Sequence, residues 1–205
     1  MAETGEQPIL NLIGEKVALG PMHPGLLLRI ATWYNDFATG AISGDDLRPI
    51  SPAAVEAEWE PLMKGERSGW IGFAIYELAT LRPIGHANIR DLGSVHRTAE
   101  FGILIGEADC RGKGYGTEAT QLVLDYAFTA LGVHNVWLDT LSFNAAAIGA
   151  YTRAGFREIG RRRQAYRIGD RVFDVVLMDC LATEFRRPRA DGWGLAGIDP
   201  PTAGR

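Results

Sequence analysis

A glycine-rich turn between an apolar run and a long periodic segment constrains this chain of 205 residues more than any other feature. The run over residues 101–105 is short and continuously apolar, which is typical of a strand buried on both faces. Beyond the turn, apolar side chains recur from Ala119 to Ala130 at helical spacing, and Gly132 stands where a C-terminal cap belongs. The sequence therefore predicts a strand, a turn and a helix over residues 99–131.

The turn, residues 111–116, carries glycine at every second position, so few side chains cover its backbone N–H groups. The first N–H groups of a helix lack intrahelical partners and the helix dipole adds positive charge there, so such a turn can bind phosphate. A Walker A loop is excluded, because Gly106 lies too far from Gly112 and no Ser or Thr follows Lys113. Thr117, in place of a third glycine, excludes a dinucleotide fingerprint. A flexible glycine turn with solvated charges is the remaining alternative.

The turn resembles motif A of the GNAT superfamily of N-acetyltransferases, in which Arg-x-x-Gly-x-Gly follows a strand and precedes a helix. Arg111, Gly114 and Gly116 fill this pattern. The resemblance implies that the loop amides hold the pyrophosphate of acetyl-CoA, the expected co-substrate. It also implies that the preceding strand hydrogen-bonds the pantetheine arm.

A second segment, residues 135–156, resembles motif B of the same superfamily, a strand followed by Asn-x-x-Ala-x-x-x-Tyr-x-x-x-Gly-Phe. Asn144, Ala147, Tyr151, Gly155 and Phe156 occupy its positions. Asn144 can cap a helix that Gly155 ends. Alone, Asn144 would indicate only a helix cap and Tyr151 only core packing, but motif A upstream favours functional roles. The cofactor-binding residues that the two motifs imply are Ile103, Leu104, Ile105, Arg111, Gly112, Lys113, Gly114, Tyr115, Gly116, Thr117 and Asn144.

The resemblance covers roughly residues 10–185 and implies an α+β fold. We expect a mixed, mostly antiparallel twisted sheet flanked by helices, with two strands that splay apart at the cofactor. A single domain is expected over residues 1–185, followed by a tail rich in Gly, Pro and Ala over residues 186–205.

Local patterns predict the remaining elements. The N-terminal half should hold a strand over residues 11–19, a helix over 24–36, a loop over 37–50, a helix from Ser51 to about Gly65, and strands over 70–77 and 83–90. After Phe156 we expect a polar segment and a closing strand over residues 171–181. Asp36 at the end of the first predicted helix and Asp45 and Asp46 in the loop could meet an amine, and a solvated acidic loop is at least as good an interpretation of each.

Composition excludes several classes of function. A net charge of −4 disfavours a nucleic-acid binder. The first twenty residues lack the pattern of a signal peptide and no apolar run reaches membrane-spanning length, so we expect a cytoplasmic protein without a membrane partner. The two cysteines, Cys110 and Cys180, have neither metal-ligand spacing nor a disulfide framework, and no metal is expected. A homodimer is plausible by resemblance.

The implied chemistry is direct transfer of an acetyl group from acetyl-CoA to a primary amine. We expect Tyr151 to return a proton to the CoA thiolate, since a phenol with a pKa near 10 is only slightly weaker as an acid than a thiol near 8.5. Glu100 is the first candidate for the base, with a surface carboxylate as the alternative. His86 is the second candidate, and deprotonation through water is the third.

The sequence does not determine which amine accepts the acyl group or which acyl-CoA donates it. The segments 33–36 and 142–144 resemble the ribosomal-protein-alanine and polyamine branch, so a protein N-terminus, a polyamine, an aminoglycoside and a small amine are all candidates. A non-catalytic acyl-CoA-binding module and an acyltransferase with another acyl-CoA donor are the rival interpretations. Gly149 departs from the motif B pattern inside a predicted helix, where glycine costs up to about 1 kcal/mol.

Overall fold

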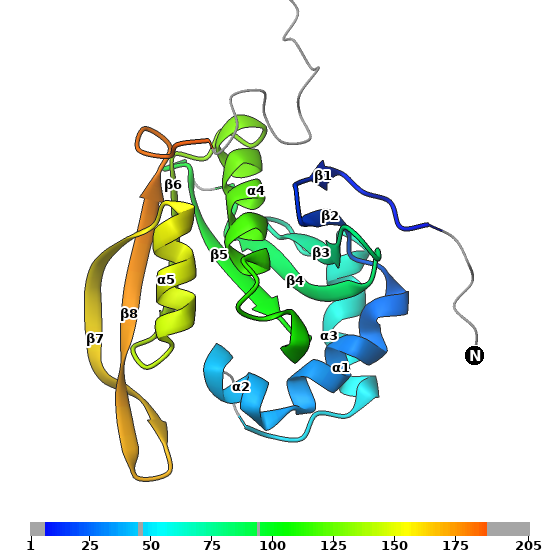
Figure 1. Cartoon of the computed structure of the whole chain (residues 1–205), viewed down its shortest axis with the longest axis horizontal. Helices are drawn as coiled ribbons and strands as arrows, with labels where there is room; N and C mark the ends of the chain where they lie inside the picture. Colours follow the sequence, from blue (N-terminus) through cyan, green and yellow to red (C-terminus); the bar gives the residue numbers. More distant parts are fainter. Residues whose placement is uncertain (1–6, 45–46, 94, 188–205) are drawn as a thin grey trace, which may run out of the picture.

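The computed structural model describes residues 7–44, 47–93 and 95–187 (Figure 1). Its eight strands form one sheet in the order β1-β2-β3-β4-β5-β6-β8-β7. The strands are β1 (Leu12–Ile13), β2 (Val17–Pro21), β3 (Ile71–Glu77), β4 (Pro83–Arg90), β5 (Thr98–Ile105), β6 (Asn135–Leu141), β7 (Arg157–Ile168) and β8 (Arg171–Leu181). The α-helices are α1 (Leu27–Asn35), α2 (Phe37–Ser43), α3 (Pro52–Met63), α4 (Tyr115–Thr129) and α5 (Ala145–Ala154), and short 3₁₀ helices span Pro24–Leu26 and Ala108–Cys110.

One pair of strands breaks the antiparallel pattern of the sheet. β5 and β6 are parallel and pair only from Thr98 to Glu100 on β5, opposite Asn135 to Trp137 on β6. Beyond Glu100 the two strands separate, while β5 stays paired with β4 and β6 stays paired with β8. The expected α+β fold and its splayed strand pair are thereby confirmed.

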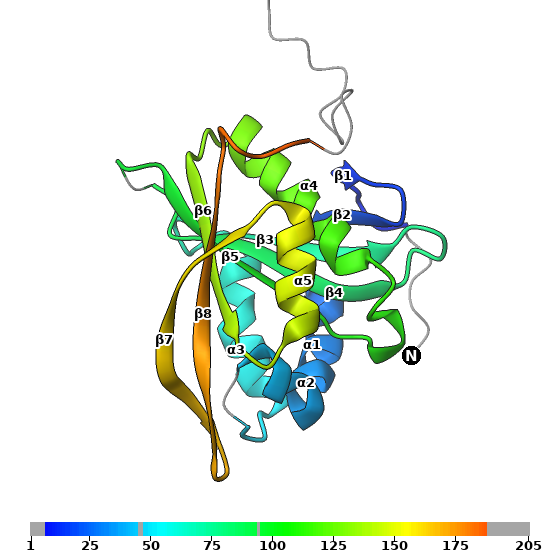
Figure 2. The same ribbon diagram turned by 60° about the vertical axis from the view of Figure 1, so that its left-hand side comes forward.

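The sheet is covered on both faces (Figure 2). Side chains of β3 alternate between them, since Phe73 and Ile75 join the apolar cluster under α4, whereas Ala74 and Tyr76 join the cluster under α1 and α3. The periodic residues from Ala119 to Ala127 lie in the first cluster, as the sequence predicts, whereas Ala130 lies past the end of α4 and is exposed.

Two expectations for the N-terminal half are wrong. Residues 11–19 form two antiparallel strands instead of one, because the carboxylate of Glu118 on α4 accepts hydrogen bonds from the amides of Glu15 and Lys16 and fixes a turn there. The predicted loop over 37–50 begins with α2, whose first turn is capped by Asp36, which accepts from the amide of Ala38. Asp45 and Asp46 lie outside the described residues.

The polar segment after Phe156 is β7, an exposed strand that pairs with β8 across the turn at Gly169. Residues 188–205, most of the predicted tail, lie outside the described part of the chain. None of the described helices has the length and apolarity that crossing a membrane requires.

Candidate functional site

A cavity of about 450 Å³ lies where β5 and β6 separate. Residues of β5, of α2, of α5 and of the glycine-rich loop over residues 111–117, named the phosphate loop after its predicted role, surround it. Those that line it from these four elements are Phe101 to Ile105, Arg111, Gly112, Gly114, Gly116, Thr117, Ile42, Ser43, Asn144 to Ala147, Ala150, Tyr151 and Arg153.

The strand β5 faces this cavity with an unpaired edge. One edge pairs with β4, where Ile103 lies opposite Ala87 and Leu104 opposite His86. The other edge pairs with β6 only as far as Glu100, so its backbone groups from residue 101 onward have no strand partner. Such groups can hydrogen-bond an extended ligand laid between the strands.

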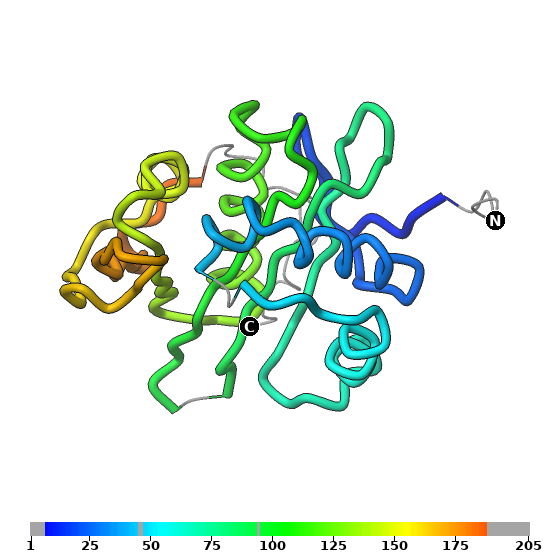
Figure 3. Tube along the Cα trace, turned by 90° about the horizontal axis from the view of Figure 1, so that it is seen from below, coloured from blue at the N-terminus to red at the C-terminus, as the bar shows by residue number. Residues whose placement is uncertain are grey.

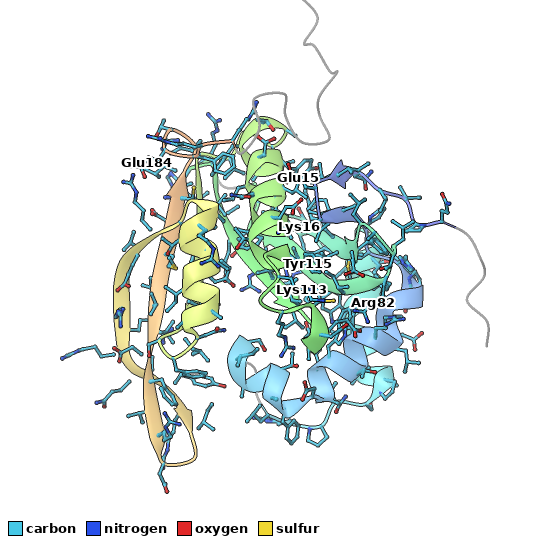
Figure 4. The ribbon with its side chains drawn as sticks, in the orientation of Figure 1. Glu15, Lys16, Arg82, Lys113, Tyr115 and Glu184 are labelled. Atoms are coloured by element: carbon cyan, nitrogen blue, oxygen red, sulfur yellow. The ribbon has the colours of Figure 1, made fainter. Side chains whose placement is uncertain are left out.

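The phosphate loop has the backbone form that its glycines predict. Gly112 and Gly114 adopt φ values of 73° and 87°, in the left-handed region that favours glycine. Gly114 provides no side-chain cap, so no capping bond covers the first amides of α4. Lys113 and Tyr115 lie beside the beginning of α4 (Figure 4), and the Tyr115 hydroxyl donates to Glu77 at 2.8 Å. Neither side chain lines the cavity, whereas Gly112, Gly114 and Gly116 of the same loop do.

The side chain of Arg111 is engaged within the protein. It donates to the carbonyls of Ile105 and Gly106 at 3.0 and 3.1 Å and to the hydroxyl of Thr39 at 2.7 Å. Thr39 is buried on α2, so Arg111 connects the phosphate loop with that helix.

Asn144 also uses both ends of its amide within the protein. Its Oδ1 accepts from the amide of Ala147 at 3.1 Å, as a helix cap does, and its Nδ2 donates to the carbonyl of Ile42 at 2.9 Å. Seen from below, α2 runs from α1 toward α5 (Figure 3). Arg111 and Asn144, both predicted from the motifs, thus hold α2 at the mouth of the cavity.

Tyr151 lies in the cavity wall, with its ring against Phe101 and Phe156 at centroid distances of 6.4 and 6.0 Å. Burial, with the nearby charge of Asp139, raises the pKa of Tyr151 to about 12. The phenol therefore keeps its proton throughout the neutral range. Its hydroxyl has no hydrogen-bond partner among residues 7–44, 47–93 and 95–187.

Glu100 forms an ion pair with Arg90, the residue opposite it on β4. Arg90 lines the cavity and Glu100 does not. Asp139 on β6 lines the cavity too, and its charge helps raise the pKa of Arg90 after the larger effects of the hydrogen bond and charge of Glu100. The predicted base, Glu100, therefore lies outside the cavity lining, whereas its partner Arg90 and a second carboxylate, Asp139, are part of that lining.

His86 on β4 also lines the cavity, and it is only 5% exposed. Its Nε2 lies 3.4 Å from the hydroxyl of Tyr34 and its Nδ1 has no hydrogen-bond partner in the part of the chain described. The ring of Trp59 packs against it at 4.8 Å. Burial lowers the pKa of His86 to about 4, so this imidazole is neutral at neutral pH.

Sequence reasoning missed several residues of the wall. Tyr34, Ile42 and Ser43 come from segments outside both motifs, and only the folded position of α1 and α2 brings them to the cavity. Arg153 lies inside motif B at a variable position, and the unexplained Gly149 one helical turn earlier was the signal that could have found it.

Comparison with known proteins agrees with this geometry. The acetyltransferase (GNAT) domain family matches residues 17–157. The spermidine N(1)-acetyltransferase of Vibrio cholerae is 32% identical over 111 residues, which are 54% of this chain and 64% of that protein. The spermidine N(1)-acetyltransferase of Escherichia coli K12 is 32% identical over 94 residues, 46% of this chain and 50% of that protein. The chain thus spans about half to two thirds of the length of these curated relatives.

Solved structures show the same fold. The spermidine N-acetyltransferase of Vibrio cholerae in complex with CoA and spermine superposes with a TM-score of 0.75 at 24% identity, over 83% of this chain and 98% of that chain. A GNAT-family acetyltransferase of Bacillus anthracis gives a TM-score of 0.72 at 16% identity, over 84% and 99% of the two chains. The matched domain, the splayed strands and the two motifs lead to one conclusion: this chain belongs to the GNAT acetyltransferase family.

Proposed function

We propose that this protein is an enzyme that transfers an acetyl group from acetyl-CoA directly to a primary amine. The observation that carries the proposal is the single cavity that joins three features: the unpaired edge of β5, the uncapped turn before α4, and Tyr151. The named relatives support it, because their printed names describe acetylation of an amine.

Different segments of the site would bind different parts of acetyl-CoA. Amides of the phosphate loop, residues 111–117, would hold the pyrophosphate, and the edge of Ile103 to Ile105 that lacks a strand partner would orient the pantetheine arm. Acetyl-CoA, when bound, supplies the activated acyl group. Backbone N–H groups at the splayed edge would then polarise the thioester carbonyl.

Tyr151 serves the leaving sulfur as a hydrogen-bond donor. With a pKa of about 12, it would give up its proton to a thiolate, whose acid has a pKa near 8.5, at a cost of about 5 kcal/mol. A hydrogen bond to the developing negative charge has no such cost, because the proton stays on oxygen. We therefore assign Tyr151 this donor role, with the proton of the amine reaching sulfur at the end of the reaction.

The proton of the amine needs an acceptor, and we propose Glu100, whose partner Arg90 lines the cavity although Glu100 itself does not. Asp139 is the alternative in the wall. Replacing Glu100 by Gln should lower kcat/KM for the amine about a hundredfold, whereas Asp139→Asn should stay near wild type. A loss with Asp139→Asn alone would assign the base to Asp139.

The charges of the wall favour an acceptor with a single ammonium group. Among the described lining residues away from the phosphate loop and α5, the wall has one arginine, Arg90, and one carboxylate, Asp139. A polyamine presents several positive charges and would need more carboxylates beside it. We therefore propose a monoamine, such as a peptide N-terminus, although the named relatives act on spermidine.

The test is release of free thiol from acetyl-CoA in the presence of peptides with free N-termini, polyamines, aminoglycosides and small amines. We expect turnover with one acceptor class, and loss of about two orders of magnitude in kcat for Tyr151→Phe with unchanged acetyl-CoA affinity. Tyr126→Phe is the matched control, because Tyr126 packs on Phe73 away from the cavity. Tight acetyl-CoA binding without turnover on any acceptor would favour a binding module or another acyl donor. That the protein forms a homodimer and that it is cytoplasmic are predictions from the sequence.

A further inference from the structure

Arg162 is an exposed cation on β7 for which the described residues provide no counter-ion. Three other arginines of the strand, Arg157, Arg161 and Arg167, do form ion pairs, with Glu184, Glu158 and Asp170. The chain as a whole carries a net charge of −4, so this free guanidinium is a local feature of the strand. An unpaired cation on the surface is available to an anionic ligand.

Arg162 shares a face of the sheet with Asp139 of the cavity wall. Residues directly opposite one another on paired strands point to the same face, and so do residues two apart on one strand. Asp139 on β6 lies opposite Leu177 on β8, and Leu177 lies opposite Gly160 on β7. Because Arg162 follows Gly160 by two residues, its side chain points to the face that carries Asp139.

This face is open between the cavity and β7 in the part of the chain that the structure describes. Asp139 is exposed, and Leu177 and Gly160 are half-buried. The opposite face is the covered one, because Val176 and Met178 of β8 lie in the apolar cluster under α4. Seen from below, the β7–β8 hairpin lies at the other side of the molecule from α1 and α3 (Figure 3). An extended segment can therefore cross the sheet from the cavity to β7.

Asp139 lies beside the groups assigned to the reaction, so it marks where the amine of the acceptor would lie. It lines the cavity together with Tyr151 and Arg90. Burial and the charge of Asp139 raise the pKa of Tyr151, and Glu100 and then Asp139 raise the pKa of Arg90. Two strand spacings and a rise of two residues separate Asp139 from Arg162, which is about 12 Å between their Cα atoms. An extended peptide covers this distance in about three to four residues.

We propose that Arg162 binds an acidic side chain of a peptide acceptor, about three to four residues after its N-terminal amine. The inference rests on the proposed function and narrows its acceptor to peptide N-termini with an acidic residue near this place. A guanidinium suits a carboxylate, because its planar donors match the two oxygens as a pair. The same charge repels the further ammonium groups of a polyamine that lies along this face.

Turnover of matched peptides tests the proposal. The peptides have a free N-terminal Ala and differ only in the fourth residue, which is Glu, Gln or Lys. The proteins are wild type, Arg162→Gln, Arg162→Glu and the control Arg161→Gln, whose side chain points to the other face because Arg161 lies opposite Val176. At low salt we expect wild type to have about three- to fivefold higher kcat/KM for the Glu peptide than for the Gln peptide. This preference should vanish in Arg162→Gln, turn toward Lys in Arg162→Glu and persist in Arg161→Gln.

Moving the Glu along the peptide tests whether Arg162 binds it at one place. The preference should be greatest at about the fourth and fifth residues and fall away at the second and the eighth. Equal preference at every place, or a preference kept in Arg162→Gln, would overturn the proposal, and so would turnover of small amines with none of peptides. No turnover of any acceptor would refute the proposed function. Fluorescence anisotropy of the labelled Glu and Gln peptides, with CoA present, would then still show whether Arg162 binds the acidic side chain.

Discussion

At the scale of the single residue, the buried imidazole of His86 makes stability depend on pH. Its pKa is lowered to about 4 by burial, from 6.5 in the unfolded chain. Between these values the unfolded state binds more protons, so the stability that is present above pH 6.5 is lost as the pH falls toward 4. We expect the free energy of unfolding to fall by about 2 kcal/mol between roughly pH 7 and pH 5, measured by urea unfolding.

The substitution His86→Gln should remove most of this pH dependence, although it also lowers stability at neutral pH. A smaller slope should persist, because burial lowers the pKa of His23 as well. The control is His96→Gln, since His96 is exposed and its replacement should keep the wild-type slope. A wild-type slope retained in His86→Gln would show that another group takes up the protons.

At the scale of the element, α2 depends on one buried hydroxyl. Thr39 accepts a hydrogen bond from Arg111 and donates one to Asp36, the cap of the same helix. Thr39→Val keeps the shape and removes both bonds, so we expect a loss of about 1–3 kcal/mol in the free energy of unfolding. Because Ile42 and Ser43 line the cavity, KM for the amine should also rise roughly tenfold while acetyl-CoA affinity stays unchanged.

The matched control for this helix is Thr32→Val on α1. The hydroxyl of Thr32 is exposed and donates to the carbonyl of Leu28 in its own helix. The free energy of unfolding and KM for the amine should therefore both stay near their wild-type values. If Thr39→Val lowered stability and left KM for the amine unaltered, α2 would be a structural support and not a wall of the acceptor site.

Some of these elements could be predicted from the sequence and others could not. Motif spacing predicted the phosphate loop and the order of the flanking strand and helix, because these depend on local periodicity and on glycines that need left-handed φ values. It could not predict the split of residues 11–19, because the carboxylate that fixes the turn comes from Glu118, about a hundred residues away. Nor could it show that Arg111 and Asn144 use their side chains on α2, since that helix itself was predicted as a loop.

At the scale of the whole molecule, Glu118 joins the first two strands to the central helix. This carboxylate is 7% exposed and accepts from two backbone amides of the β1–β2 turn. Glu118→Ala removes the charged acceptor of two backbone amides at an exposed turn, so we expect a loss of about 2 kcal/mol in the free energy of unfolding. Glu118→Gln keeps an acceptor oxygen and should lose only about 1 kcal/mol. Glu58→Ala, at an exposed position of α3, should stay within about 0.5 kcal/mol of wild type.

Urea unfolding shows whether the β1–β2 hairpin unfolds together with the rest of the molecule or separately. β1 and β2 continue a sheet that runs through all eight strands, and Lys16 of the same turn donates to the carbonyl of Lys113 in the phosphate loop at 3.3 Å. The hairpin and the loop should therefore unfold together, and Glu118→Ala should shift one transition to lower urea with an unchanged m-value. A reduced m-value, with the main transition in place, would mean that the hairpin opens separately. Saturating acetyl-CoA should then stabilise the main transition alone, because a ligand stabilises only the unit whose folded form binds it.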